Sequence, residues 1–215
     1  MTADLGRTTS MAMISALLLV GPVRAETQVA GYLGVSWTAA SNVTLGGQTF
    51  HGVSWESRSL EMPPYYGLRV AYFFAGNSGL GLALDFFHDK AYSTDGSLAP
   101  ALRRLSFSHG LNHLTIDVDW RTHLGPLRPY VGMGIGTLVP HVEAASDTAS
   151  TDEYQWFRGV SVKVQVGAQW RLVGPAGIFL EYRLTFAHLG VSVPGGTLRT
   201  SLWTNHLALG AFVAF

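Results

Sequence analysis

The stretch Val160-Ser161-Val162-Lys163-Val164-Gln165-Val166 places a valine at every second position and a polar residue between each pair. Because successive side chains of a β-strand point to opposite faces, this period of two predicts a strand with one apolar and one polar face. The same alternation recurs in seven further stretches: residues 31–37, 68–74, 80–86, 114–121, 131–136, 178–186 and 207–215. The sequence therefore predicts an all-β protein of eight strands.

The composition indicates what the apolar faces meet. Of the 215 residues, 47% are hydrophobic and 13% are charged, against about 25% charged in an ordinary soluble domain. The opposite faces carry mostly glycine, alanine, serine and threonine with a few charges of both signs, which suits the narrow, side-chain-filled interior of an eight-stranded barrel. The chain has 14 basic and 14 acidic residues, so it lacks the excess of positive charge that nucleic-acid-binding proteins carry. The lack of cysteine excludes disulfides and thiolate chemistry.

The connections between the predicted strands alternate in length. Residues 75–79, 123–129 and 172–177 are short connections, whereas residues 39–63, 93–105, 142–155 and 188–199 are long ones. Short periplasmic turns and long outer loops are typical of transmembrane barrels. Aromatic residues mark both predicted interfaces: Trp120, Trp170 and Phe215 at one end, Trp37, Tyr66 and Trp203 at the other. We expect one antiparallel up-and-down transmembrane barrel over residues 26–215, monomeric and in the bacterial outer membrane.

The first 25 residues differ from the rest of the chain. Met11 to Val20 is an almost unbroken apolar run that follows Arg7, and Val23-Arg24-Ala25 ends it in an A-x-A-like way. The run is shorter than the about 20 residues that a transmembrane helix needs. We therefore expect residues 1–25 to be a secretory signal peptide.

Charged residues also fall on inward-facing positions of the predicted strands. They are Arg69, Asp85, Asp117, Asp119, Lys163, Glu181, Arg183 and His206. Buried charges must be paired, so mixed signs at similar heights predict an ion-pair network inside the barrel. The glycines of Gly132-Met133-Gly134-Ile135-Gly136 alternate along a strand with no helix after them, so we expect them to face the interior rather than to bind phosphate.

Polar residues replace apolar ones where three neighbouring strands reach the outer rim. On the outward-facing register, His88 follows Phe86, Asn112 precedes Leu114, and His141 and Glu143 continue the strand that contains Ile135. Neighbouring strands lie about 4.8 Å apart, which places the backbones of His88 and His141 about 10 Å apart with Asn112 between them. Two histidines and a carboxylate are the ligand set of non-haem iron oxygenases, so His88, His141 and Glu143 form a candidate metal site.

Two other interpretations of this rim stay open. In the first, the histidines bind no metal, because histidine is a common residue where strands leave the membrane and meet water. In the second, a bulge at Pro140 would turn the His141 side chain into the lumen. In that second case the alternative metal site consists of inward-facing side chains: Asp85, Asp89 and Asp117, with His113 or His109.

Several short motifs are spread along the chain. They are WESRSLEMPPYYG at residues 55–67, LDFFHDKAY at 84–92, GLN at 110–112, PYVG at 129–132, PHVE at 140–143, EYQ at 153–155, EY at 181–182 and TN at 204–205. These motifs resemble those of the rhizobial lipid A oxidase family, and the resemblance covers nearly all of residues 26–215. One departure is His109, where an acidic residue is expected.

The resemblance implies oxidation of the proximal glucosamine of lipid A to 2-aminogluconate. Dioxygen would be the oxidant, hydrogen peroxide the by-product and a divalent metal ion, expected to be iron, the cofactor. Side chains alone cannot pass electrons to dioxygen, and the chain has no flavin or nicotinamide motif, which also favours a metal. On this hypothesis the catalytic residues are His88, Asn112, His141 and Glu143. The substrate-binding residues are Arg58, Glu61, Tyr65, Tyr66, Lys90 and Tyr154.

Two other functions remain open at this point. One is a non-catalytic barrel whose long loops bind lipopolysaccharide or a surface partner. The other is a lipid A deacylase, which needs a serine activated by a histidine and an orienting acid. Ser108-His109 is the only adjacent pair, and neighbours in a strand project to opposite faces, which argues against it. The first loop is expected to be structured, with Arg58 either holding a lipid phosphate or pairing with Glu61.

Overall fold

The computed structural model describes residues 24–76, 79–94 and 96–215. Residues 1–23 of the predicted signal peptide lie outside the described residues. Within the described part of the chain, no helix is long and apolar enough to cross a membrane.

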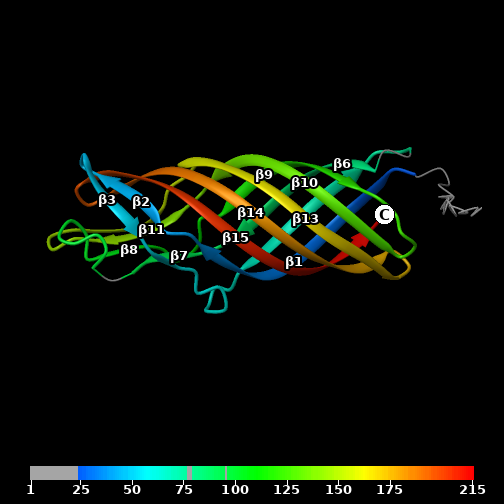
Figure 1. Ribbon diagram of the computed structural model, residues 1–215, viewed down its shortest axis with the longest axis horizontal. Helices are drawn as coiled ribbons and strands as arrows, with labels where there is room; N and C mark the ends of the chain where they lie inside the picture. Colours follow the sequence, from blue (N-terminus) through cyan, green and yellow to red (C-terminus); the bar gives the residue numbers. More distant parts are fainter. Residues whose placement is uncertain (1–23, 77–78, 95) are drawn as a thin grey trace, which may run out of the picture.

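Eight antiparallel strands form a closed barrel (Figure 1). In spatial order they are β1 (Glu26–Thr38), β5 (Tyr66–Phe73), β6 (Leu80–His88), β9 (His113–Arg121), β10 (Leu127–Leu138), β13 (Gly159–Val173), β14 (Ala176–Val193) and β15 (Gly196–Ala214). The barrel closes where β15 pairs with β1, in a register that runs from Gln28↔Ala214 to Thr38↔Thr204. The eight strands and the barrel predicted from the alternation are confirmed.

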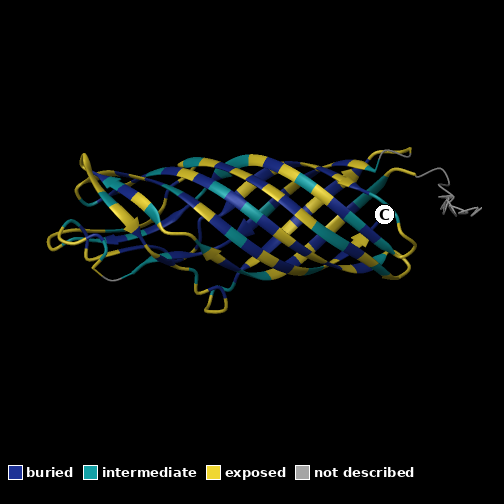
Figure 2. Ribbon diagram, viewed as in Figure 1, coloured by how far each residue is buried: buried dark blue, intermediate teal, exposed yellow. Residues whose placement is uncertain are grey.

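The outer face of the barrel is apolar, and Figure 2 shows how exposed and buried residues alternate along the barrel strands that face the viewer. On β13 the outward-facing Val160, Val162, Val164 and Val166 are all exposed. Every barrel strand is hydrogen-bonded on both sides, so these apolar side chains can face lipid without leaving backbone groups unpaired. Exposed tryptophans lie toward both ends of this belt: Trp120 and Trp170 near the short turns, Trp37 and Trp203 near the other end.

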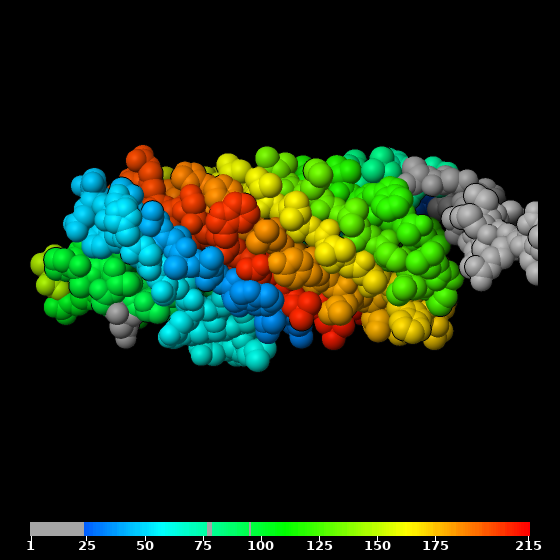
Figure 3. All heavy atoms as spheres, in the orientation of Figure 1, coloured from blue at the N-terminus to red at the C-terminus, as the bar shows by residue number. Residues whose placement is uncertain are grey.

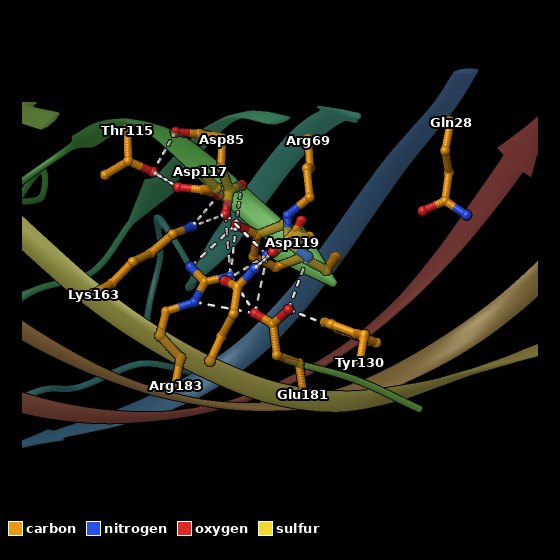
Figure 4. Close-up of polar contacts among 12 residues, drawn as sticks. Gln28, Arg69, Asp85, Thr115, Asp117, Asp119, Tyr130, Lys163, Glu181 and Arg183 are labelled. Atoms are coloured by element: carbon orange, nitrogen blue, oxygen red, sulfur yellow. Dashed lines mark hydrogen bonds and ion pairs between the residues drawn. The ribbon is translucent and has the colours of Figure 1, made fainter. Parts of the chain in front are cut away.

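The inside of the barrel holds the predicted ion-pair network (Figure 4). Arg69 binds Glu181 through Nη1 at 2.8 Å and Asp85 through Nη2 at 2.9 Å. Lys163 contacts Asp85 and lies 2.8 Å from Asp117 Oδ2. Arg183 lies 2.5 Å from Glu181 Oε1. All six of these charged side chains are buried, so the lumen is filled by mutually neutralising groups.

The interior glycines make room for this network. A Cβ atom on Gly134 would lie 2.0 Å from Asp117 Oδ1, and one on Gly132 would lie 1.9 Å from Asp119 Oδ1. The prediction that these glycines face the interior is therefore confirmed. His206, also predicted to join the network, instead hydrogen-bonds Thr185 at 2.9 Å.

The long connections are not loops throughout, as the sequence predicted, but largely strands beyond the barrel. β14 and β15 stay paired up to Val193↔Gly196, and β2 (Ser41–Leu45) and β3 (Gln48–Val53) extend the sheet beside β15. A second sheet contains β4 (Trp55–Glu56), β7 (Ala91–Ser93), β8 (Arg104–Phe107), β11 (His141–Ala145) and β12 (Ser150–Tyr154). The β2–β3 extension and the second sheet lie at the end of the molecule opposite the C-terminus (Figure 1).

A hydrophobic core explains why these segments form strands. The inward-facing positions of β14 change from the charged Glu181 and Arg183 to the apolar Leu189 and Val191. The apolar positions pack with Val142 and other buried residues of the second sheet in one cluster. Because this core lies beyond the membrane-spanning part, burial of apolar side chains stabilises the extracellular end as it would a soluble sandwich.

Candidate functional site

The outward register of β10 continues across Pro140. Val142 and Ala144 face the extracellular core, so His141 and Glu143 lie on the opposite face of β11. The bulge that would have turned His141 into the lumen does not occur. His141 and Glu143 therefore lie on the outward-facing register, as the sequence predicted.

His141 and Glu143 meet His109, which lies in the turn after β8. One ligand atom from each of the three side chains lies within 4.8 Å of the other two. The rings of His109 and His141 are 4.6 Å apart, and His109 Nδ1 is 3.8 Å from Glu143 Oε1. Among the described residues this is the one group of three or more metal-binding side chains at such distances. We call it the rim cluster.

Further polar groups surround the rim cluster. The Ser108 hydroxyl donates to Glu143 Oε1 and hydrogen-bonds His109 Nδ1 at 3.1 Å. Arg104 binds the other oxygen of Glu143, Oε2, at 2.8 Å. These contacts hold the carboxylate in one orientation beside both imidazoles.

His141 is nearly buried within the rim cluster. The ring of Tyr154 packs against it at 4.5 Å, and Asp152 Oδ1 lies 3.3 Å from its Nε2. Its Nδ1 is buried without a hydrogen-bond partner among the described residues. Burial, and next the neighbouring His109, lower the pKa of His141, which favours the neutral imidazole that binds metal ions.

His88 does not join the rim cluster, contrary to the predicted ligand set. Its Nδ1 donates to Asn112 Oδ1 at 2.9 Å, and its ring stacks on Tyr66 at 5.0 Å. The turn at Ser108–Gly110 lies against His88, because a Cβ on Gly110 would be 2.3 Å from His88 Nδ1. The amide of His141 donates to the carbonyl of Gly110 at 2.9 Å. The turn therefore places His109, rather than His88, beside His141.

Asn112 fixes that turn in place. Its Nδ2 donates to the carbonyls of His109 at 3.0 Å, Gly110 at 3.3 Å and Val139 at 2.9 Å. The backbone carbonyl of Asn112 accepts a hydrogen bond from the amide of Val139 at 3.0 Å. One side chain thus joins the segment that carries His109 to the segment that leads into His141, which makes Asn112 a positioning residue.

We expect Asn112→Ala to weaken metal binding at the rim cluster. Removing the amide leaves buried carbonyls without their donor, at a cost of about 1–3 kcal/mol, and frees the turn that carries His109. The measurement is Zn²⁺ affinity of the folded barrel by calorimetry, with Zn²⁺ as a redox-inert probe. Asn205→Ala, which removes a single hydrogen bond from Tyr182 on the outer face, is the control. Wild-type affinity in the Asn112 variant would contradict the positioning role.

The alternative inward metal site is not assembled. Asp85 and Asp117 are bound by Lys163 within the ion-pair network. Asp89 instead lies 3.0 Å from His113 Nε2. The three predicted carboxylates therefore do not converge on one point. Lys163 binds Asp85 and Asp117, whereas Asp89 lies beside His113.

Solved structures identify the fold, whereas no family model and no curated protein matches the sequence. The outer membrane protein AlkL, determined by solid-state NMR in DMPC bilayers, aligns with 100% of this chain and 97% of its own, at 13% identity and a TM-score of 0.52. The chain has the fold of an outer-membrane β-barrel. Neisserial surface protein A covers 91% of this barrel and 100% of its own chain, at 14% identity and a TM-score of 0.45. Ail of Yersinia pestis covers 90% of this barrel and 100% of its own chain, at 14% identity and a TM-score of 0.44.

The predicted substrate-binding residues of this outer-membrane barrel divide into two groups. Tyr154 packs on His141 of the rim cluster, and the exposed Tyr66 packs on His88. Tyr65, in contrast, is buried with its ring 5.6 Å from that of His206.

The first loop of the outer-membrane barrel is ordered, but by other contacts than expected. Arg58 pairs with Glu56 at 2.9 Å rather than with Glu61, and its guanidinium lies 4.5 Å from the ring centre of Tyr92. Lys90 Nζ donates to the backbone carbonyl of Glu61 at 2.8 Å. Arg58 and Lys90 therefore hold the loop at its base.

Ser108 and His109 do contact each other in the outer-membrane barrel, which corrects the argument made from strand geometry. They lie in a turn after β8 rather than within a strand, so both side chains reach the same side. Glu143 contacts the serine hydroxyl, whereas in a hydrolytic triad the acid orients the histidine. The arrangement is closer to a set of metal ligands than to a nucleophile and its base.

Proposed function

We propose that this outer-membrane barrel is a metal-dependent oxidase that converts the proximal glucosamine of lipid A to 2-aminogluconate with dioxygen. The observation that supports this proposal is the rim cluster of His109, His141 and Glu143 on the outer face, just beyond the apolar belt. Lipid A occupies the outer leaflet, so its sugars would meet this face without leaving the membrane. The sequence resemblance supplies the substrate class and the reaction.

The side chains of the rim cluster fit a divalent metal ion. Two imidazoles and one carboxylate suit iron(II) and leave coordination positions open, and the buried Nδ1 of His141 lacks another partner among the described residues. His109, His141 and Glu143 would hold the ion. When bound, it would supply the electron transfer to dioxygen that side chains lack.

The other residues would control the site. Ser108 and Arg104 each hold one oxygen of Glu143, and Tyr154 covers His141 from water. His109 is about half exposed and is the ligand nearest to solvent and substrate. The chain thereby leaves one side of the rim cluster open for the sugar.

The reaction balances with dioxygen and water as the co-reactants. The C1 position of the sugar hemiacetal loses two electrons and two protons to dioxygen, which gives a lactone and hydrogen peroxide. Water then opens the lactone to the acid, so the lipid gains one oxygen atom.

Mass spectrometry of lipid A from cells that express the protein, and whose lipid A carries no phosphate at C1, tests this function. We expect a gain of one oxygen atom in aerobic cultures and no change in anaerobic ones. Loss of an acyl chain would instead identify a deacylase. Unchanged lipid A in aerobic cells with folded barrel would contradict catalysis and favour a barrel that binds lipopolysaccharide or a surface partner.

A further inference from the structure

Basic residues lie on the outer face of β14 and β15, and at the residue before β13, above the membrane belt. Gly190 of β14 pairs with Arg199 of β15, and the carbonyl of Arg158 accepts the amide of Gly190 at 3.0 Å. Arg158 and Arg199 therefore flank Gly190 at the same height. One step lower on the outer face, His188 pairs with Ser201 and Val160. Because glycine has no side chain, nothing from β14 separates the two arginines at their level.

The two arginines differ from the other basic residues of the extracellular end. Arg58 pairs with Glu56, Arg103 with Asp147 and Arg104 with Glu143. Lys90 donates to a backbone carbonyl.

Arg158 and Arg199 are both exposed, and neither side chain has an ion pair or hydrogen bond to any described residue. Their guanidinium groups are free to bind an external anion.

A polar groove lies beside Arg199. It has a volume of about 450 Å³ and runs between β2 and the upper parts of β14 and β15; Figure 3 shows this face, with β15 in red and β14 in orange beside the blue and cyan of β2 and β3. Its lining includes Asn42, Thr44, His188, Arg199, Ser201 and Trp203, and no carboxylate. The lining offers hydrogen-bond donors and a positive charge without a competing negative group.

The height of this groove matches lipid headgroups. Phe186 pairs with Trp203, and their rings pack at 4.9 Å at the upper edge of the apolar belt. Gly190 lies four residues further along β14, which is about 14 Å along the strand and about 10 Å along the membrane normal at a 45° tilt. Interfacial aromatic residues sit at headgroup level, so His188 and the two arginines lie at and just above the lipid phosphates.

We propose that Arg158, His188, Arg199 and the adjoining groove bind the phosphate of an outer-leaflet glycolipid. The planar guanidinium fork matches phosphate oxygens in a bidentate manner, and the apolar surface below Trp203 receives the acyl chains. The proposal does not rest on the oxidation proposed above, since none of these residues belongs to the rim cluster.

The test measures binding rather than turnover. The purified full chain, folded in detergent micelles, is titrated with diphosphorylated lipid A, with the same lipid stripped of phosphate, and with inorganic phosphate. Each of Arg158→Gln and Arg199→Gln lowers affinity for the phosphorylated lipid about tenfold, and the double variant loses more. Affinity for the phosphate-free lipid stays unchanged. Arg103→Gln, which removes an exposed arginine already paired with Asp147, is the matched control.

Three results would overturn the proposal. The double variant would bind the phosphorylated lipid as tightly as the wild type, or Arg103→Gln would lose as much affinity as Arg199→Gln. Alternatively, inorganic phosphate would bind as tightly as the lipid, which would make the ligand a free anion. Because the titration measures binding without turnover, a failure of this proposal is distinguishable from a failure of the proposed oxidation.

Discussion

His141→Ala and Glu143→Gln should each lower lipid A oxidation about a thousandfold. Each variant removes one of the three side chains proposed to hold the metal ion, and a catalytic metal contributes several kcal/mol to transition-state stabilisation. The measurement is dioxygen-dependent release of hydrogen peroxide with lipid A, together with the metal content per folded chain. His51→Ala, which changes an exposed histidine of β3, should leave both quantities unchanged.

The same assay separates the two possible ligand sets. If His109 is a ligand, His109→Ala loses metal as fully as His141→Ala does. His88→Ala removes the hydrogen bond to Asn112 and the ring that packs against the turn, so it should weaken binding without abolishing it. Full metal content in His109→Ala, with complete loss in His88→Ala, would restore the set predicted from strand spacing.

Arg69→Met should destabilise the barrel by about 3–5 kcal/mol. The substitution leaves Glu181 and Asp85 buried without the guanidinium that binds both, and an unpaired buried charge carries a cost of this size. The measurement is urea unfolding in lipid vesicles, followed by the heat-modifiable mobility of the folded barrel. Arg103→Met, which breaks the exposed pair with Asp147, should cost at most about 1 kcal/mol.

A double variant provides a second check on the interior network. Arg69→Met combined with Glu181→Gln removes one positive and one negative charge, so it should recover part of the stability lost in Arg69→Met. A double variant that is less stable than the sum of the two single variants would contradict the pairing of these residues.

The membrane-spanning part of the fold was predictable from the sequence because lipid imposes a strict rule. Each spanning strand must alternate between a lipid-facing and an interior side chain, and the rule holds from Val160 to Val166 as it does at the other seven strands. The extracellular sheets obey a weaker rule. Short strands such as β4 and β7 pair across long sequence separations, and nothing local in the sequence specifies those partners.

The candidate site was likewise only partly predictable from the sequence. The outward orientation of His141 and Glu143 was predictable by continuing the alternation of β10 past Pro140. It holds because Val142 and Ala144, between and beside them, face the core. The third member, His109, lies in a turn whose position depends on the bonds of Asn112 to three carbonyls. Such tertiary contacts have no periodic signal, which is why strand spacing pointed to His88 instead.

The filled interior of the barrel has a consequence for permeability and for the direction of release. Arg69, Lys163 and Arg183 with their carboxylate partners occupy the lumen, so a planar-bilayer recording should show no ion current through the folded protein. In the proposed oxidase, dioxygen would then reach the rim cluster, and hydrogen peroxide would leave it, on the outer face rather than through the barrel. The ion pairs that hold the barrel together would in this way also keep a reactive by-product outside the cell.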